Sequence, residues 1–125
     1  MIEVYSSNVT VAADQPIPFE NVAIRKGCSA VESVTSTIQL NRAGIYLVSA
    51  DASAAAAATI QLYKDGVPQP QAVSTGTSPS FTTLVQVDRN NSKCCYSSPV
   101  LLQLINSGDA EATFTNANLT IVKIC

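Results

Sequence analysis

Histidine and tryptophan are absent from this 125-residue chain, and charged residues make up only 13% of it. The missing histidine removes the commonest general base and metal ligand. Seven basic and nine acidic residues give a net charge of −2, so no basic patch is present and nucleic acid is excluded as a partner. The charged share is about half that of an ordinary globular protein. We infer that part of the surface is covered by partners.

Long apolar runs and targeting segments are missing as well. No stretch reaches the roughly 18 apolar residues that a membrane helix needs, so no membrane partner is predicted. The start, Met1-Ile2-Glu3-Val4-Tyr5, lacks the basic end and the apolar core of a signal peptide. We therefore expect synthesis in a cytoplasm, with release inside a larger particle or after lysis.

Catalytic groups are scarce. Serine and threonine are plentiful, but without histidine a serine nucleophile would need an unusual lysine partner. The acidic residues are scattered, and the closest pair, Asp109 and Glu111, fits solvated turn positions better than a calcium site. The chain is therefore predicted not to be an enzyme, and neither a cofactor nor a metal is predicted.

What the sequence does contain is a series of short β-strands separated by turns. Asp65-Gly66 is a strong hairpin signal. The alanine run at 54–58 is interpreted as a strand end and a tight loop, and 68–79 as loop with a short edge strand at 72–74 as the alternative. Val31 and Val34 indicate a further short, loosely paired strand. This spacing is typical of a β-sandwich or barrel and predicts a single domain over residues 1–125. Strands are expected at 8–13, 17–24, 37–40, 45–50, 59–64, 81–87, 100–105, 110–116 and 119–124.

Some of these strands are apolar on both faces. In 45–50, Ile45 and Leu47 share one face while Tyr46 and Val48 share the other. The strands at 100–105 and 119–124 are two-sided in the same way. Antiparallel sheets usually leave one face to water, so we expect one sheet whose second face is covered, most simply by a copy of the same subunit.

The order and spacing of several motifs resemble the C1q/TNF-like jelly roll over most of the chain. The Gly-Ile-Tyr at Gly44 and the later Gly108-Asp109 are its best markers. The segments that carry the resemblance are Ile17-Pro18-Phe19-Glu20-Asn21-Val22, Ile38-Gln39-Leu40-Asn41-Arg42-Ala43-Gly44-Ile45-Tyr46-Leu47-Val48, Ile60-Gln61-Leu62-Tyr63-Lys64-Asp65-Gly66 and Val100-Leu101-Leu102-Gln103-Leu104, followed by Phe114, Leu119 and Ile121.

The resemblance implies an all-β, two-sheet antiparallel jelly-roll sandwich that assembles as a homotrimer around its inner sheet. Which face of strand 45–50 points to the threefold axis is left open. The last two expected strands are joined by the short segment Asn116-Ala117-Asn118, so ligand sites on the long loop of C1q domains do not carry over. The residues expected at the trimer interface are Ile45, Tyr46, Leu47, Val48, Leu101, Gln103, Ile105, Leu119 and Ile121.

The short form of the domain is similar to versions in bacteriophage virion proteins and at the tips of spore filaments. This similarity implies a structural virion protein, either a capsid decoration or a head-fibre protein, partnered by itself and by a major capsid or fibre protein. The alternative is the receptor- or glycan-binding tip of a phage tail fibre or spore-surface filament. A secreted cytokine-like ligand is a third hypothesis, which the missing signal peptide opposes.

Four cysteines and one polar loop are the remaining candidates. Cys28, Cys94, Cys95 and Cys125 allow three pairings, and no Cys-x-x-Cys zinc spacing is present. Disulfides formed after release, free thiols and a shared site at the threefold axis all stay open. In the 88–99 loop, Arg89, Lys93 and Tyr96 are candidate contacts of a binding tip.

Overall fold

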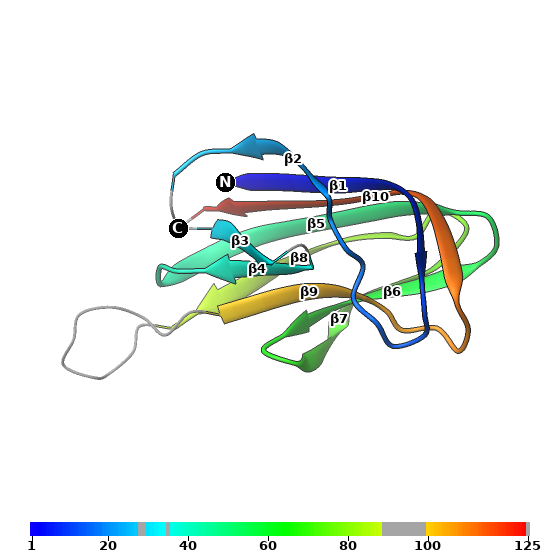
Figure 1. The fold of residues 1–125 in the computed structure, drawn as a ribbon. Helices are drawn as coiled ribbons and strands as arrows, with labels where there is room; N and C mark the ends of the chain where they lie inside the picture. Colours follow the sequence, from blue (N-terminus) through cyan, green and yellow to red (C-terminus); the bar gives the residue numbers. More distant parts are fainter. Residues whose placement is uncertain (28–29, 35, 89–99, 125) are drawn as a thin grey trace.

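A computed structural model describes residues 1–27, 30–34, 36–88 and 100–124, and of 31–34 the backbone alone. This part of the chain folds into ten β-strands (Figure 1). It contains no helix long and apolar enough to cross a membrane. The strands are β1 (Ile2–Val11), β2 (Asn21–Arg25), β3 (Ala30–Val34), β4 (Thr37–Leu40), β5 (Gly44–Ala54), β6 (Ala58–Lys64), β7 (Val67–Gly76), β8 (Ser80–Val87), β9 (Val100–Asn106) and β10 (Ala112–Lys123).

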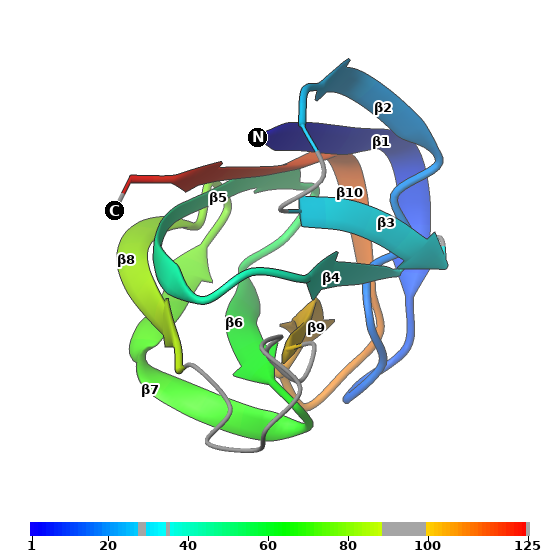
Figure 2. The ribbon, with the colours of Figure 1, turned by 90° about the vertical axis from the view of Figure 1, so that its left-hand side faces the viewer.

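The strands form two five-stranded antiparallel sheets that face each other. The first sheet has the order β2-β1-β10-β5-β8, and the second has the order β3-β4-β9-β6-β7. Seen from the end in Figure 2, the two sheets form two layers, and the termini lie close together at one end of the sandwich. The predicted all-β fold with two antiparallel sheets is confirmed.

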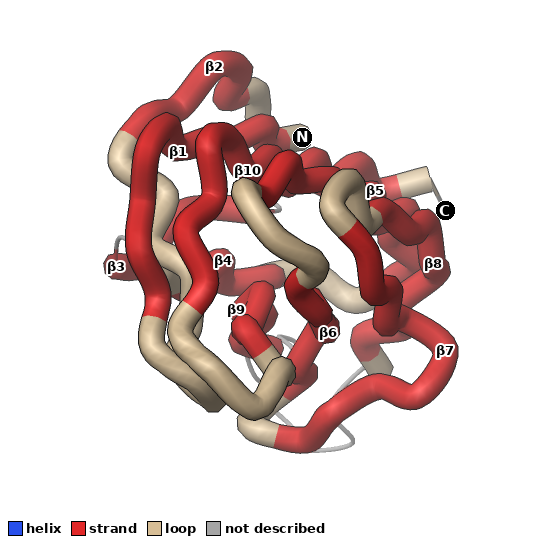
Figure 3. The backbone as a smooth tube through the Cα atoms, turned by 90° about the vertical axis from the view of Figure 1, so that its right-hand side faces the viewer, coloured by secondary structure: helices blue, strands red, loops and turns tan. Residues whose placement is uncertain are grey.

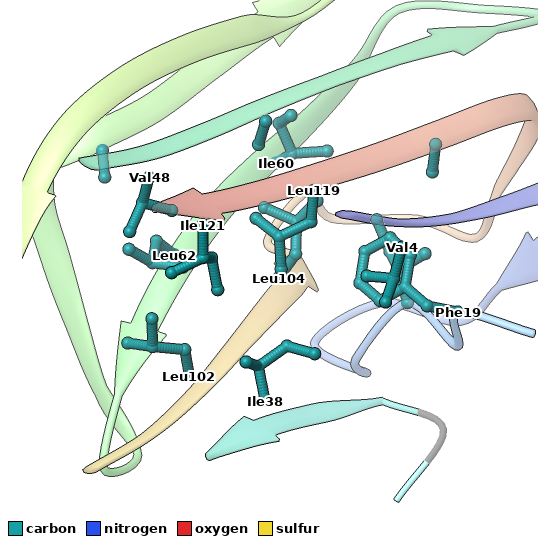
Figure 4. Packing of buried hydrophobic residues seen from close by; sticks show 14 of the residues in the cluster. Val4, Phe19, Ile38, Val48, Ile60, Leu62, Leu102, Leu104, Leu119 and Ile121 are labelled. Carbon is teal, nitrogen blue, oxygen red and sulfur yellow. The ribbon is translucent and has the colours of Figure 1, made fainter. Parts of the chain in front are cut away.

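Alternation within each strand builds the core between the sheets. Val4, Val48, Leu119 and Ile121 of the first sheet and Leu62, Leu102 and Leu104 of the second are fully buried, and Figure 4 shows them pointing toward one another. Fully burying an aliphatic side chain of this size contributes about 2 kcal/mol. Both sheets therefore contribute side chains to one core, and the packing of this core fixes which face of each sheet points outward.

Two turn predictions are confirmed by the backbone. Asp65 and Gly66 have φ values of 52° and 80°, the left-handed geometry of a two-residue hairpin turn, and they join β6 to β7. The Asp65 carboxylate also accepts a hydrogen bond of 2.9 Å from the Leu101 amide. The alanine run ends β5 at Ala54 and begins β6 at Ala58, as expected from its flanking strands.

Asn106 is the last residue of β9, and its side chain links neighbouring turns. Figure 3 shows the end of the sandwich that lies away from the termini. The Asn106 side chain is buried, and its amide nitrogen donates to the carbonyls of Val11, at 3.0 Å, and Ala110, at 3.1 Å. Its amide oxygen accepts from the Gly108 nitrogen at 3.2 Å. One side chain thus ties the turn between β9 and β10 to the end of β1.

The structure corrects several of the expected strands. The strand expected at 8–13 is β1 at Ile2–Val11, and the one expected at 17–24 is β2 at Asn21–Arg25. The segment 68–79, expected as loop or at most a short edge strand at 72–74, contains most of β7, a ten-residue strand at the edge of the second sheet. An edge strand tolerates Pro68 and Pro70 because one side of it needs no ladder hydrogen bonds. The expected strands at 110–116 and 119–124 are a single strand, β10.

The grouping of the two-sided strands is also corrected. Strands β5 and β10 are neighbours in the first sheet, but β9, which holds 100–105, lies between β4 and β6 in the second. Beyond its pairing with β4, β9 also pairs along its edge with 16–17, because the Ile17 amide donates to the Leu104 carbonyl and Pro16 forms a bridge with Ile105. An apolar pattern gives the faces of one strand, but not the sheet to which the strand belongs.

Candidate binding face of the first sheet

The two faces of β5 have different fates. Tyr46 and Val48 are fully buried between the sheets, whereas Ile45 and Leu47 point away from the core. The Tyr46 hydroxyl donates to the Arg42 carbonyl at 2.7 Å, which fixes the buried ring at the start of the strand. The sequence did not tell which face of this strand could meet a partner. In the single chain it is the face of Ile45 and Leu47, because Tyr46 and Val48 are buried.

Four residues therefore leave the set of expected interface residues. Tyr46, Val48, Leu119 and Ile121 are buried inside the chain, where no partner reaches them. Leu119 and Ile121 pair with Ala50 and Val48 across β10 and β5, and all four point into the core. The prediction is corrected because strand periodicity marks two apolar faces without telling which one packs on the other sheet.

The remaining expected interface residues lie on two different sheets. Leu101 and Gln103 are on the outward side of β9, with Leu101 exposed and Gln103 half-buried, and Ile105 is buried. The Gln103 amide donates to the Thr37 hydroxyl at 3.1 Å. Ile45 and Leu47 lie on the first sheet, so the structure does not bring the expected set together on one surface.

An apolar band does form on the outward face of the first sheet, at the end nearer the termini. Val122, Leu47 and Leu84 are direct cross-strand neighbours on β10, β5 and β8. Leu84 is 55% exposed and Leu47 37% exposed. Ile124 joins them, because its amide donates to the Ile45 carbonyl at 2.8 Å. We call Ile45, Leu47, Leu84, Val122 and Ile124 the apolar band.

The same face changes to polar chemistry farther along the strands. It is hollowed there into an open cavity of about 630 Å³, within the size range of small-molecule sites. We call it the polar trough. The residues that line it are Tyr5, Ser7, Asp51, Ala52, Ser53, Ser78, Ser80, Asn116, Ala117 and Asn118.

Strand register places the trough side chains in two rows. Tyr5, Asn118, Asp51 and Ser80 are consecutive cross-strand neighbours from β1 to β8. Ser7, Asn116 and Ser53 form the second row. Three strand spacings separate the ends of the first row, which is about 14 Å. The trough is thus an elongated surface crossed by four strands.

A β-bulge explains why the sheet is hollowed at this place. Phe114 pairs with Ala54 while Asn116 pairs with Ser53, so Thr115 has no opposite residue on β5. The Thr115 hydroxyl donates to the Ser53 carbonyl at 3.1 Å. A bulge bends its strand and redirects side chains. Here it exposes Thr115 and Asn116 in succession while Phe114 and Ala117 stay buried.

Hydrogen bonds hold the walls of the trough. The amides of Ala52 and Ala54 donate to the carbonyls of Pro79, at 3.0 Å, and Thr77, at 2.8 Å, which places the β7–β8 connection beside β5. On the other side, the Asn118 amide and the Thr120 hydroxyl both donate to the Glu3 carboxylate, at 3.1 and 3.2 Å. Asn118 is therefore oriented before any ligand arrives.

Sequence reasoning missed the trough. Tyr5, Asp51 and Asn116 lie far apart in the chain, and the Asn116-Ala117-Asn118 segment was expected to be a connection between strands. One signal was present: Phe114 and Ala117 are three residues apart, which breaks the alternation of a regular strand and is typical of a bulge.

Other sequence candidates fall elsewhere. The cysteines Cys28, Cys94, Cys95 and Cys125 and the tip candidates Arg89, Lys93 and Tyr96 lie outside the described residues. Asp109 and Glu111 border a smaller cavity of about 310 Å³ at the β9–β10 turn. Within the described ranges, no three acidic, histidine or cysteine side chains come close enough to hold a metal ion.

Comparison with known proteins places the fold. The chain is similar to the globular domain of zebrafish complement 1qA protein, with a TM-score of 0.71 at 12% identity, over 99% of this chain and 96% of that one. It is also similar to the Eiger TNF of S. frugiperda, with a TM-score of 0.64 at 12% identity over 99% and 92%. Murine APRIL gives 0.62 at 11% identity over 98% of both chains.

These likenesses show a C1q/TNF-like fold, as the sequence motifs implied. No family model matches the chain. No curated protein matches it by sequence either. At such low identity the likeness extends to the fold alone, so function has to be argued from the face just described.

Proposed function

We propose that this chain is a structural protein that assembles as a homotrimer through the apolar band. The observation that carries the proposal is the row Val122, Leu47 and Leu84, which crosses three adjacent strands on a face that the described part of the chain leaves uncovered. Contiguous apolar patches of this kind mark interaction sites on soluble proteins. The C1q/TNF-like fold favours a threefold arrangement over other symmetries.

The band is suited to pack against copies of itself. Ile124 is 53% exposed, and its position after the last strand extends the band beyond the end of β10. Burying a half-exposed leucine or isoleucine contributes about 1 kcal/mol. Each subunit contributes three exposed side chains of this kind, Leu47, Leu84 and Ile124, and symmetry repeats the gain in every subunit.

The finer proposal is a virion protein, either a capsid decoration or a head-fibre protein. The low charged share of the chain supports a surface that is largely covered in an assembly, and the resemblance of the short domain to phage virion proteins supports the particle. The docking partner in this proposal is a major capsid or fibre protein.

Mass measurement of the native protein, with and without reductant, tests the assembly. Analytical sedimentation at micromolar concentration should give three chain masses. If the mass is the same in reductant, the apolar band and not a disulfide holds the subunits. A monomer at this concentration would overturn the homotrimer.

Immunogold labelling of virions with an antibody against the chain tests the location. Label over the head supports capsid decoration or a head fibre. Label at the tail tip would instead favour a binding tip of a tail fibre, which is the second candidate function. Virions that carry no label would overturn the virion assignment.

The second candidate is the receptor- or glycan-binding tip of a tail fibre or spore-surface filament. One observation favours it. The polar trough is a preorganised hollow whose side chains come from four strands, and several of them make no hydrogen bond within the described chain. Such a surface is better suited to a hydrophilic ligand than to a dry protein contact.

A further inference from the structure

We infer that the polar trough binds a neutral carbohydrate, with the ring of Tyr5 as the platform for one sugar. This inference deepens the second candidate function by naming its site and its ligand class. It does not depend on the trimer, because the trough and the apolar band are separate parts of one sheet face.

The chemistry of the trough indicates a ligand rich in hydroxyl groups. Ser7 and Ser53 each offer a hydroxyl that both donates and accepts, and Asn116 offers an amide with both functions. These side chains make no hydrogen bond with the described part of the chain. Sugar hydroxyls are also donors and acceptors, so each of these groups can be satisfied without a charge.

Charge argues against anionic ligands. Among the described residues that line the trough there is no lysine or arginine, and Asp51 is exposed within it. A phosphate, a sulfate or an acidic sugar would meet the Asp51 carboxylate without a compensating cation. A neutral ligand can instead use this carboxylate as a hydrogen-bond acceptor.

Shape and aromatic position agree with an elongated sugar chain. Tyr5 is 39% exposed at one end of the row that runs through Asn118 and Asp51 to Ser80. Its ring combines an apolar body with a polar tip, which suits the apolar face and the hydroxyl rim of a pyranose. The row measures about 14 Å, long enough for an oligosaccharide rather than a single ring.

The trough stays accessible if the trimer uses the apolar band. A polar row of Glu3, Thr120, Ser49 and Thr82 separates the two surfaces. Glu3 in this row accepts hydrogen bonds from Asn118 and Thr120. The polar row therefore also orients Asn118, a side chain of the trough, through the Glu3 carboxylate.

Titration of the isotope-labelled full chain by NMR tests the inference. Lactose, maltose and cellobiose are the neutral probes, each added to about 20 mM, because an open site with one aromatic platform is expected to bind with a Kd of about 1 mM. Glucosamine and glucuronate serve as cationic and anionic probes. Backbone signals of Ser7, Ser53 and Asn116 should shift with at least one neutral sugar.

Matched variants locate the binding. Tyr5→Ala should weaken the affinity about tenfold, while Tyr5→Phe, which keeps the ring, should retain most of it. Asp51→Ala, which removes a hydrogen-bond acceptor from the trough, should weaken neutral-sugar binding about threefold. Thr82→Ala, on the same face but outside the trough, is the control and should bind like the parent.

Several results would overturn the inference. They are the absence of shifts with every neutral probe, shifts confined to other surfaces, and tighter binding of glucosamine or glucuronate than of any neutral sugar. A loss of the trimer in Leu84→Glu with sugar binding retained would support the inference and separate it from the assembly. Loss of sugar binding in Leu84→Glu, with the NMR spectrum otherwise intact, would mean that the sugar binds at the contact between subunits. That result would overturn the inference.

Discussion

The two halves of the outward face of the first sheet share the same strands but differ in chemistry. On β5 the outward residues change from Ile45 and Leu47 to Ser49 and Asp51, and on β8 they change from Leu84 to Thr82. On β10 the same change occurs between Val122 and Thr120, since Thr120 is the neighbour of Ser49. Three strands therefore switch at the same row of the sheet.

This difference separates two tasks that a single exposed face can perform. The apolar band contributes free energy when it leaves water, so it is suited to a permanent contact. The polar trough gains little from leaving water, because its groups are already hydrated, and it is suited to an exchangeable ligand. The predictions below test whether the two halves are independent.

The largest effect is expected from a charge placed in the apolar band. Leu84→Glu should raise the dissociation constant of the trimer by at least about 100-fold, because a carboxylate would be buried without a partner. Sedimentation over a range of concentrations measures this shift.

Thr82→Glu is the matched control, two residues away on the same strand and face. It should leave the trimer intact, because Thr82 lies in the polar row outside the band. Equal effects of the two variants would contradict the division of the face.

A smaller effect is expected when two asparagines at the same end of the sandwich are compared. Asn106→Ala should lower the free energy of unfolding by about 3 kcal/mol, since the carbonyls of Val11 and Ala110 lose their buried donor. Asn116→Ala, in the trough, should change it by less than about 0.5 kcal/mol.

Urea unfolding at matched protein concentration measures both values, because assembly shifts apparent stability. A cost above about 2 kcal/mol for Asn116→Ala would mean that the trough is part of the framework and not a free binding surface.

The smallest effect is expected at the row between the halves. Glu3→Gln keeps an acceptor for Asn118 and Thr120 but removes the charge, so stability should fall by about 0.5 kcal/mol. NMR signals of the Asn118 side-chain amide should move, while sedimentation stays unchanged. A dissociated trimer would place this row inside the interface and contradict the boundary.

Local patterns predicted much of the fold. The turn at Asp65 and Gly66 and the end of β5 in the alanine run follow from backbone preference and from flanking alternation, which act over a few residues. The motifs around Gly44-Ile45-Tyr46 indicated a C1q/TNF-like sandwich, and the structural likenesses agree. The length of the edge strand β7 was underestimated, because its prolines resemble loop chemistry.

The candidate site was predicted only in part. Ile45 and Leu47 were expected at an interface and are available for one, but their expected neighbours on β9 lie in the other sheet. Leu84 is the most exposed of the band residues that lie on strands. It was not predicted at an interface, because the strand 81–87 is not among those that are apolar on both faces. Its role depends on being opposite Leu47, which is a long-range pairing.

The sequence by itself determined that this chain is an all-β protein with more apolar strand surface than one core needs. Strand alternation and turn chemistry are local, so they can be recognised without the fold. Only the tertiary structure decided which surplus face stays open, since Tyr46 and Val48 are buried by the second sheet while Leu47 is not. The trough likewise exists only because the bulge at Thr115 and the pairing of four distant strands bring Tyr5, Asp51 and Asn116 together.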